Sequence, residues 1–138
     1  DEIEAFLIDA GERFDVRSIP YDPFAFQLLM QAVGKVGLPT LDFPQTDARM
    51  VPATTATREL IVARRLEHDG DPLAAEQMAD AVAKAGRMRS GDRIIKTPDR
   101  KPNDDVVALV MAIAEATRPA DEDERKPNIR VWGDDEAA

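Results

Sequence analysis

The segment 102–116, PNDDVVALVMAIAEA, constrains the fold more than any other stretch of this sequence. After Asp105 it has no polar residue before Glu115, so we expect a helix that is buried on nearly every side. One interpretation of the acids at its start is that Asn103 or Asp104 caps the helix, where a negative charge also suits the helix dipole. The other interpretation is that a carboxylate held on a rigid, buried helix binds a metal ion.

The residue types that the chain lacks restrict the chemistry of any metal site. The 138 residues, enough for one domain with a modest core, contain no cysteine and a single histidine, His68. Disulfides, cysteine-bound metals and histidine-rich zinc sites are therefore excluded. Any metal must be bound mainly by carboxylates, which suits Mg²⁺ or Mn²⁺.

The apolar segments and the first residues indicate a globular protein that is neither secreted nor embedded in a membrane. The longest apolar stretch is too short to span a bilayer. The first ten residues hold four acids and no base, which is unlike a signal peptide. The sequence starts at Asp1, without a methionine and within a helical pattern, so we expect a fragment of a longer protein.

Charge is distributed unevenly along the chain. The net charge is −9, which argues against a nucleic-acid partner. The segment 84–101, called here the basic strip, nevertheless carries seven bases against two acids, whereas 121–138 carries seven acids against three bases. A local basic strip can bind phosphates on an acidic protein. Charge alone favours the alternative, a solvated hairpin.

Hydrophobic periodicity predicts helices that alternate with short strands. We expect helices at 2–14, 23–36, 56–68, 70–85 and 104–117, strands at 14–22 and 38–45, a turn at 46–55, and a hairpin at 86–97 that turns at Ser90-Gly91. This order implies helices packed on a mostly parallel α/β sheet. So few strands suggest that further strands precede Asp1. We expect one domain over 1–118 and a disordered acidic tail over 119–138.

Two aspartates occupy positions where such a fold places ligands. Asp22 ends a predicted strand and precedes the helix that starts at Pro23, at the edge of the sheet where α/β sites form. Asp104 begins the buried helix, and Asp105 follows it as a weaker candidate. The alternative for Asp22 is an N-cap before a proline, which is the commoner role for such a residue. Two acids that both start rigid helices are compatible with a shared metal site.

Three further groups of side chains are candidates for the site. His68 leaves a helix beside a turn, and its alternative is a surface histidine that hydrogen-bonds the loop. Lys96 follows a predicted strand, and its alternative is a lysine that blunts a sheet edge. Arg87, Arg89, Arg93 and Lys96 are the candidates for contacting DNA phosphates.

Three stretches of the sequence together resemble the nuclease domain of tailed-phage terminase large subunits, in the group with HK97-type capsids. VRSIPYDPFAFQLL contains an aspartate-proline-aromatic step at Asp22-Pro23-Phe24. LEHDGDP, at 66–72, matches a leucine-x-histidine segment of that family, and IIKTPDRKPNDDVVALVMAIAEA matches its late lysine and aspartate at Lys96 and Asp104. The resemblance covers about 2–118.

The resemblance implies an RNase H-like fold and a catalytic mechanism. Members of that family cut concatemeric double-stranded DNA with two divalent metal ions, Mg²⁺ or Mn²⁺, held by three acids. Two of these acids map onto Asp22 and Asp104, with Asp105 as a further possible ligand. The third would lie on a strand that this sequence lacks, so we expect the chain alone to be inactive.

The resemblance also implies partners and a location. The expected partners are double-stranded DNA, the portal, the small terminase subunit and an ATPase domain, in the cytoplasm of an infected bacterial host. Two alternatives stay open: another RNase H-like nuclease of the resolvase or integrase type, and an α/β interaction module whose acids only cap helices.

Overall fold

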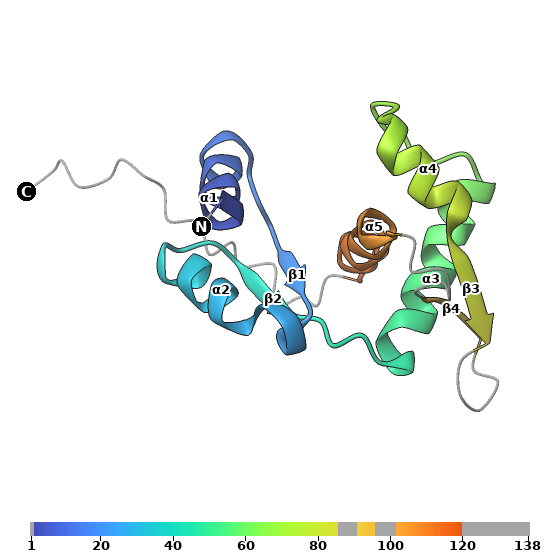
Figure 1. The fold of residues 1–138 in the computed structure, drawn as a ribbon, viewed down its shortest axis with the longest axis horizontal. Coiled ribbons are helices and arrows are strands. Elements are labelled where there is room, and N and C mark those ends of the chain that lie inside the picture. The colour runs from blue at the N-terminus through green and yellow to red at the C-terminus, as the bar shows by residue number, and fades with distance from the viewer. Residues whose placement is uncertain (1, 86–90, 96–101, 120–138) are drawn as a thin grey trace, which may run out of the picture.

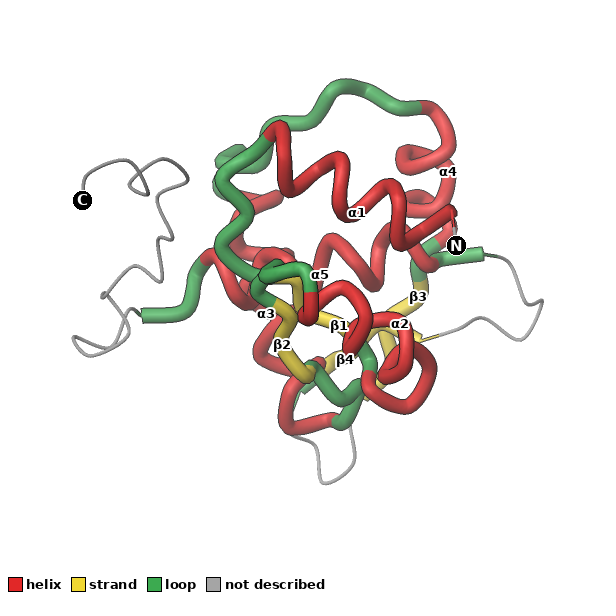
Figure 2. The backbone as a smooth tube through the Cα atoms, turned by 90° about the vertical axis from the view of Figure 1, so that its left-hand side faces the viewer, coloured by secondary structure: helices red, strands yellow, loops and turns green. Residues whose placement is uncertain are grey.

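The computed structural model describes residues 2–85, 91–95 and 102–119. Short strands lie between most of the helices along the chain, although α4 follows α3 directly (Figure 1). The elements are α1 (Glu2–Arg13), β1 (Ile19–Tyr21), α2 (Pro23–Lys35), β2 (Thr40–Asp42), α3 (Asp47–Val62), α4 (Pro72–Asp80), β3 (Val82–Ala85), β4 (Asp92–Ile95) and α5 (Asp104–Ala116). Figure 2 shows the strands lying among the helices.

The strands form two separate pairs. β1 and β2 run parallel, with Ile19 opposite Thr40 and Tyr21 opposite Asp42. β3 and β4 run antiparallel, with Val82 opposite Ile95. Because β1 and β2 are parallel, their carboxyl ends lie at the same edge, where the chain enters α2 and α3.

The last helix joins the two halves of the structure. Figure 1 shows α1 and α2 on one side of the β1–β2 pair and α5 on the other. α5 packs against β1, α3 and α4, and α3 in turn packs against β4. The central core cluster follows this arrangement, because its buried members come from α3, α5 and the residue after β2: Phe43, Met50, Ala53, Val106, Val110 and Met111.

Aspartate-proline pairs start two helices, and the sequence predicts such a start at Asp22-Pro23. The Asp22 side chain accepts a hydrogen bond from the backbone N–H of Phe24, at 3.1 Å, and Pro23 opens α2. The Asp71 side chain accepts from the N–H of Ala74, at 2.9 Å, at the start of α4. Proline suits the first helical position, because its missing N–H would have no partner inside the helix.

The expected turn at 46–55 is wrong, because these residues belong to α3, which begins at Asp47 and ends at Val62. Pro52 lies inside this helix. Thr55, which indicated a turn, and Thr57, in the predicted helix that follows, donate their hydroxyls to backbone carbonyls four residues earlier. Burial of one face of α3 against α5 outweighs the weak helix propensity of threonine.

The boundary between the fourth helix and the hairpin is also displaced. α4 ends at Asp80, and Val82–Ala85 forms β3, the strand that pairs with β4. The predicted hairpin is thus present, but its first strand begins before the expected 86–97. The expected turn position Ser90 lies outside the described residues, whereas Gly91 has a positive φ of +117°.

The prediction that the last helix is buried on nearly every side is wrong. Val106, Val110, Met111 and Ile113 are buried, whereas the small side chains on the opposite face, including Ala108 and Ala112, are exposed. The uninterrupted apolar sequence therefore forms a helix that is buried on one side only. The sequence pattern does not reveal this, because alanine occupies both buried and exposed positions.

Two expectations concern segments beyond these elements. Among the described helices, none combines the length and the apolar character needed to cross a membrane. The disordered tail was expected over 119–138, and from residue 120 onwards it lies outside the described residues.

Candidate metal and DNA-binding site

Asp22 lies at the carboxyl end of β1 and has an extended backbone, with φ −79° and ψ 111°. Its Oδ1 atom caps α2 through Phe24, and its backbone carbonyl accepts from the N–H groups of Ala25 and Phe26, both at 3.1 Å. The capping role expected for Asp22 is therefore confirmed. The cap uses one of two carboxylate oxygens, so capping and metal binding are compatible in the same side chain.

Asp104 is the first residue of α5, not its cap, so the interpretation of this acid as a capping residue is wrong. The cap position belongs to Asn103, whose side chain makes no capping hydrogen bond. Asp104 is exposed, at the end of the helix where the dipole favours a negative charge. The position suits a cation ligand, because the side chain leaves from the first turn of a well-packed helix.

Asp105 is exposed too, but its backbone has a partner from another helix. Its N–H donates to Oε1 of Gln77 on α4, at 3.0 Å. Gln77 thus satisfies one of the N–H groups that the start of α5 cannot pair internally. This inter-helix cap was missed from the sequence, because no local pattern links residues 77 and 105.

The donor set fits a hard divalent cation in type but not in number. Asp22 and Asp104 supply carboxylate oxygens, the ligands that Mg²⁺ prefers. Within residues 2–85, 91–95 and 102–119, no cluster of three or more histidine, cysteine, aspartate or glutamate residues could hold a metal ion. α5 packs on β1, the strand that ends beside Asp22. That the carboxylates of Asp22 and Asp104 face one another remains a prediction.

Asp42 is an acid at the same edge that the sequence did not single out. Asp42 ends β2 and lies opposite Tyr21 in the parallel pair. Tyr21 is the residue directly before Asp22. The hydrogen bond to Asp42, with smaller contributions from burial and charge repulsion, raises the pKa of Tyr21 above its ordinary value of 10.0. The usable signal was the strand pairing, which brings the ends of two strands together.

Arg93, a candidate for contacting DNA, has partners within the domain. Its guanidinium lies 2.7 Å from Oδ1 of Asp47 and 3.3 Å from the carbonyl of Gln45. It therefore ties β4 to the start of α3. The other three candidates of the basic strip, Arg87, Arg89 and Lys96, lie outside the described residues.

His68 is an exposed residue of the loop between α3 and α4. Its Nδ1 atom accepts a hydrogen bond from the N–H of Gly70, at 3.0 Å. This is the loop contact expected of a surface histidine. The structure therefore gives His68 a local role in its loop. Among the described residues, His68 belongs to no cluster of three or more potential metal ligands.

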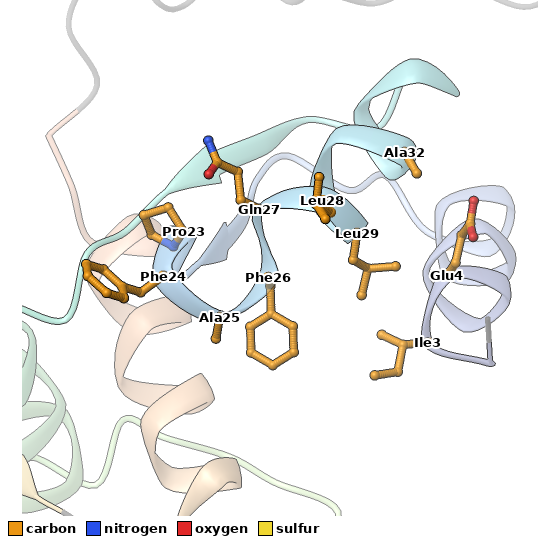
Figure 3. A pocket seen from close by; sticks show the side chains of 10 residues that line it. All are labelled: Ile3, Glu4, Pro23, Phe24, Ala25, Phe26, Gln27, Leu28, Leu29 and Ala32. Carbon is orange, nitrogen blue, oxygen red and sulfur yellow. The ribbon is translucent and has the colours of Figure 1, made fainter.

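A cavity of about 700 Å³ lies between α1 and α2. Figure 3 shows its lining, which starts at Pro23, next to Asp22, and continues with apolar side chains such as Ile3, Phe26 and Leu29. The charged residue in this lining is Glu4. With a single carboxylate among apolar groups, this cavity does not suit a divalent metal.

The chain is similar to known proteins in sequence and in fold. The family model described as terminase large subunit, endonuclease domain, matches residues 1–120. No curated protein matches the chain. The crystal structure of the large terminase of bacteriophage HK97 superposes with a TM-score of 0.73 at 21% identity, over 83% of this chain and 24% of that one. This likeness confirms the predicted α/β fold of a terminase nuclease domain, and the chain spans about a quarter of that relative's length.

Proposed function

Because the chain belongs to the family of terminase large-subunit endonuclease domains, we propose that it is part of a nuclease that cuts concatemeric double-stranded viral DNA during genome packaging. The observation that carries this proposal is the position of Asp104, exposed at the first residue of α5. The helix behind it is held by β1, α3 and α4. The family match favours this function over a resolvase or integrase-type nuclease.

The proposed metal ligands are Asp22 and Asp104, with Asp105 assisting through water. Two divalent ions, Mg²⁺ or Mn²⁺, would activate a water molecule and stabilise the leaving oxygen of the phosphodiester. The described residues offer fewer than three clustered acids, so a further carboxylate from outside them is needed to bridge two cations. We therefore expect little or no cleavage by this chain alone.

The proposed partners follow from the family. Double-stranded DNA would contact the basic strip through Arg87, Arg89 and Lys96. In a longer protein, an ATPase domain, the small terminase subunit and the portal would act with this domain in the cytoplasm of the infected host and at the procapsid portal. The support for a longer protein is that the chain covers 24% of the HK97 large terminase.

Cleavage by a full-length protein that carries this domain tests the assignment. With Mg²⁺ or Mn²⁺, Asp22→Asn and Asp104→Asn should each reduce cleavage to the level measured in the presence of a chelator. Asp9→Asn is the matched control, since it removes a carboxylate of α1 that pairs with Arg13, outside the proposed site, and should retain full activity. Full-rate cleavage by the Asp104→Asn protein would show that this acid is not a ligand.

A Mn²⁺ titration separates the nuclease from the non-enzymatic alternative. A metal-binding domain is stabilised by its ligand according to mass action, so its melting temperature rises with the Mn²⁺ concentration. An interaction module whose acids only serve the helices would show no such shift.

A further inference from the structure

Buried polar side chains form hydrogen bonds at the start of α5 and at β4, the strand that precedes it. Four polar residues are buried in the described part of the chain: Thr54, Thr57, Gln77 and Asn103. Thr57 bonds a carbonyl of its own helix. The other three form hydrogen bonds with β4 or with the first turn of α5. Buried polar groups are costly unless paired, so their placement at one junction needs an explanation.

Asn103, the residue before Asp104, is anchored to β4 by its own side chain. Its side chain is 2% exposed, and its Nδ2 atom donates to the carbonyl of Ile95, at 2.9 Å. The opposite orientation of the amide would bring Oδ1 against that carbonyl, so the hydrogen bond determines how the side chain lies. The side chain thus joins β4 to α5 instead of capping the helix in the ordinary way.

Gln77 holds the residue after Asp104 from the other side. It is 7% exposed, in the middle of α4, and its Oε1 atom accepts from the N–H of Asp105. Asp104 therefore lies between two backbone positions that are each fixed by a buried amide side chain. Both amides are buried and form hydrogen bonds with backbone groups, so their role is to hold the backbone.

β4 is itself held firmly enough to serve as an anchor. The N–H of Ile94 donates to the hydroxyl of Thr54 on α3, and the neighbouring Arg93 pairs with Asp47. The backbone around Asp104 is thereby linked to α3 through β4 and to α4 through Gln77.

We propose that Asn103 and Gln77 are positioning residues, which fix the carboxylate of Asp104 for metal binding. This inference rests on the proposed function, in which Asp104 is a ligand. Groups that orient a ligand without touching the metal commonly change metal affinity by about 10–100-fold when they are removed.

Replacing Gln77 tests the first contact. Gln77→Met keeps the length of the side chain and removes the amide oxygen, so Mn²⁺ affinity should fall about tenfold. Gln77→Glu keeps an acceptor for the Asp105 N–H and adds a negative charge, so its Mn²⁺ affinity should be at least that of the parent protein. Paramagnetic broadening of the Asp104 and Asp105 amide signals during a Mn²⁺ titration measures both.

Asn103→Asp tests the second contact and separates positioning from charge. The substitution places an oxygen against the Ile95 carbonyl and adds a negative charge next to Asp104. Charge alone would tighten the binding of a cation. If the anchor matters, Mn²⁺ affinity should fall about tenfold despite the added charge. Unchanged or tighter binding would overturn the role of Asn103.

Two further variants distinguish the possible failures. Thr57→Val is the control for stability, because Thr57 is equally buried but bonds only its own helix. It should leave Mn²⁺ affinity unchanged, and a tenfold loss in this variant would overturn the positioning role. If Asp104→Asn loses the broadening while Gln77→Met binds Mn²⁺ like the parent protein, the positioning inference is refuted and the proposed ligand is kept. No broadening in the parent chain, or parent-like broadening in Asp104→Asn, would refute the proposed ligand, and the inference with it.

Discussion

Arg93 and Asp47 form an ion pair of 2.7 Å that joins β4 to the first turn of α3. Their side chains are 34% and 24% exposed, so solvent screens the pair only in part. Asp47 also lies where the dipole of α3 favours an acid. The pair therefore has a structural role in a segment whose charge first suggested DNA binding.

A double-mutant cycle measures this pair. Arg93→Ala, Asp47→Ala and the double variant should give a coupling free energy of about 0.5–1 kcal/mol in urea unfolding, because partly exposed pairs contribute little more. The coupling should decrease at high salt. A coupling of zero at low salt would mean that the pair does not stabilise the domain.

Arg87 and Arg89 are the residues with which the proposed DNA contacts of the basic strip are tested. Arg93 is left unchanged, because it pairs with Asp47 within the domain. Replacing Arg87 and Arg89 with alanine should weaken binding to duplex DNA and reduce the slope of log affinity against log salt by about two, since each phosphate contact contributes about 0.9. Arg13→Ala is the control, because Arg13 lies on α1 and pairs with Asp9. Equal slopes in the parent and the double variant would exclude these contacts.

Asp22 combines two roles that substitutions can separate. Asp22→Asn should preserve stability, because asparagine caps a helix as well as aspartate does, whereas Asp22→Ala should cost about 1 kcal/mol. Both variants should lose metal-dependent cleavage in the full-length protein. If Asp22→Asn cleaves normally while Asp22→Ala only lowers the unfolding free energy, Asp22 is a cap and nothing more.

Tyr21 should titrate above its ordinary range. It is the single tyrosine of the chain, so the ultraviolet absorbance of tyrosinate reports this residue alone. The hydrogen bond to Asp42 raises the pKa of Tyr21, and Asp42→Asn should lower it towards 10.0. The stability linked to this group is present below the unfolded pKa and is lost as the pH rises through the folded pKa. Identical titrations in both proteins would rule out the contact.

Local sequence signals predicted the helix starts of this domain well. The pair Asp22-Pro23 starts α2 as expected, and Asp71-Pro72 starts α4 in the same way, because capping depends on residues within one turn. The same logic failed at 46–55, where Pro52 and several threonines indicated a turn. There, packing against α5 decides the structure, and this contact is far away in the sequence.

The candidate acids could be chosen from the sequence, but the residues that hold their backbone could not. Asp22 and Asp104 could be chosen because each precedes or begins a helix. Asn103 was considered only as a cap, and Gln77 was not considered at all. Their hydrogen bonds to Ile95 and Asp105 span 8 and 28 positions, and no periodicity within one element encodes such pairs.

The central position of α5 has a consequence for how the domain is made. α5 is the last described helix to be synthesised, yet it packs on β1, near the beginning of the chain, and on α3 and α4. Contacts of such high sequence separation slow folding, because a long loop must close before they form. We therefore expect a nascent chain to remain without its main core, and open to proteases, until residues 104–116 have left the ribosome.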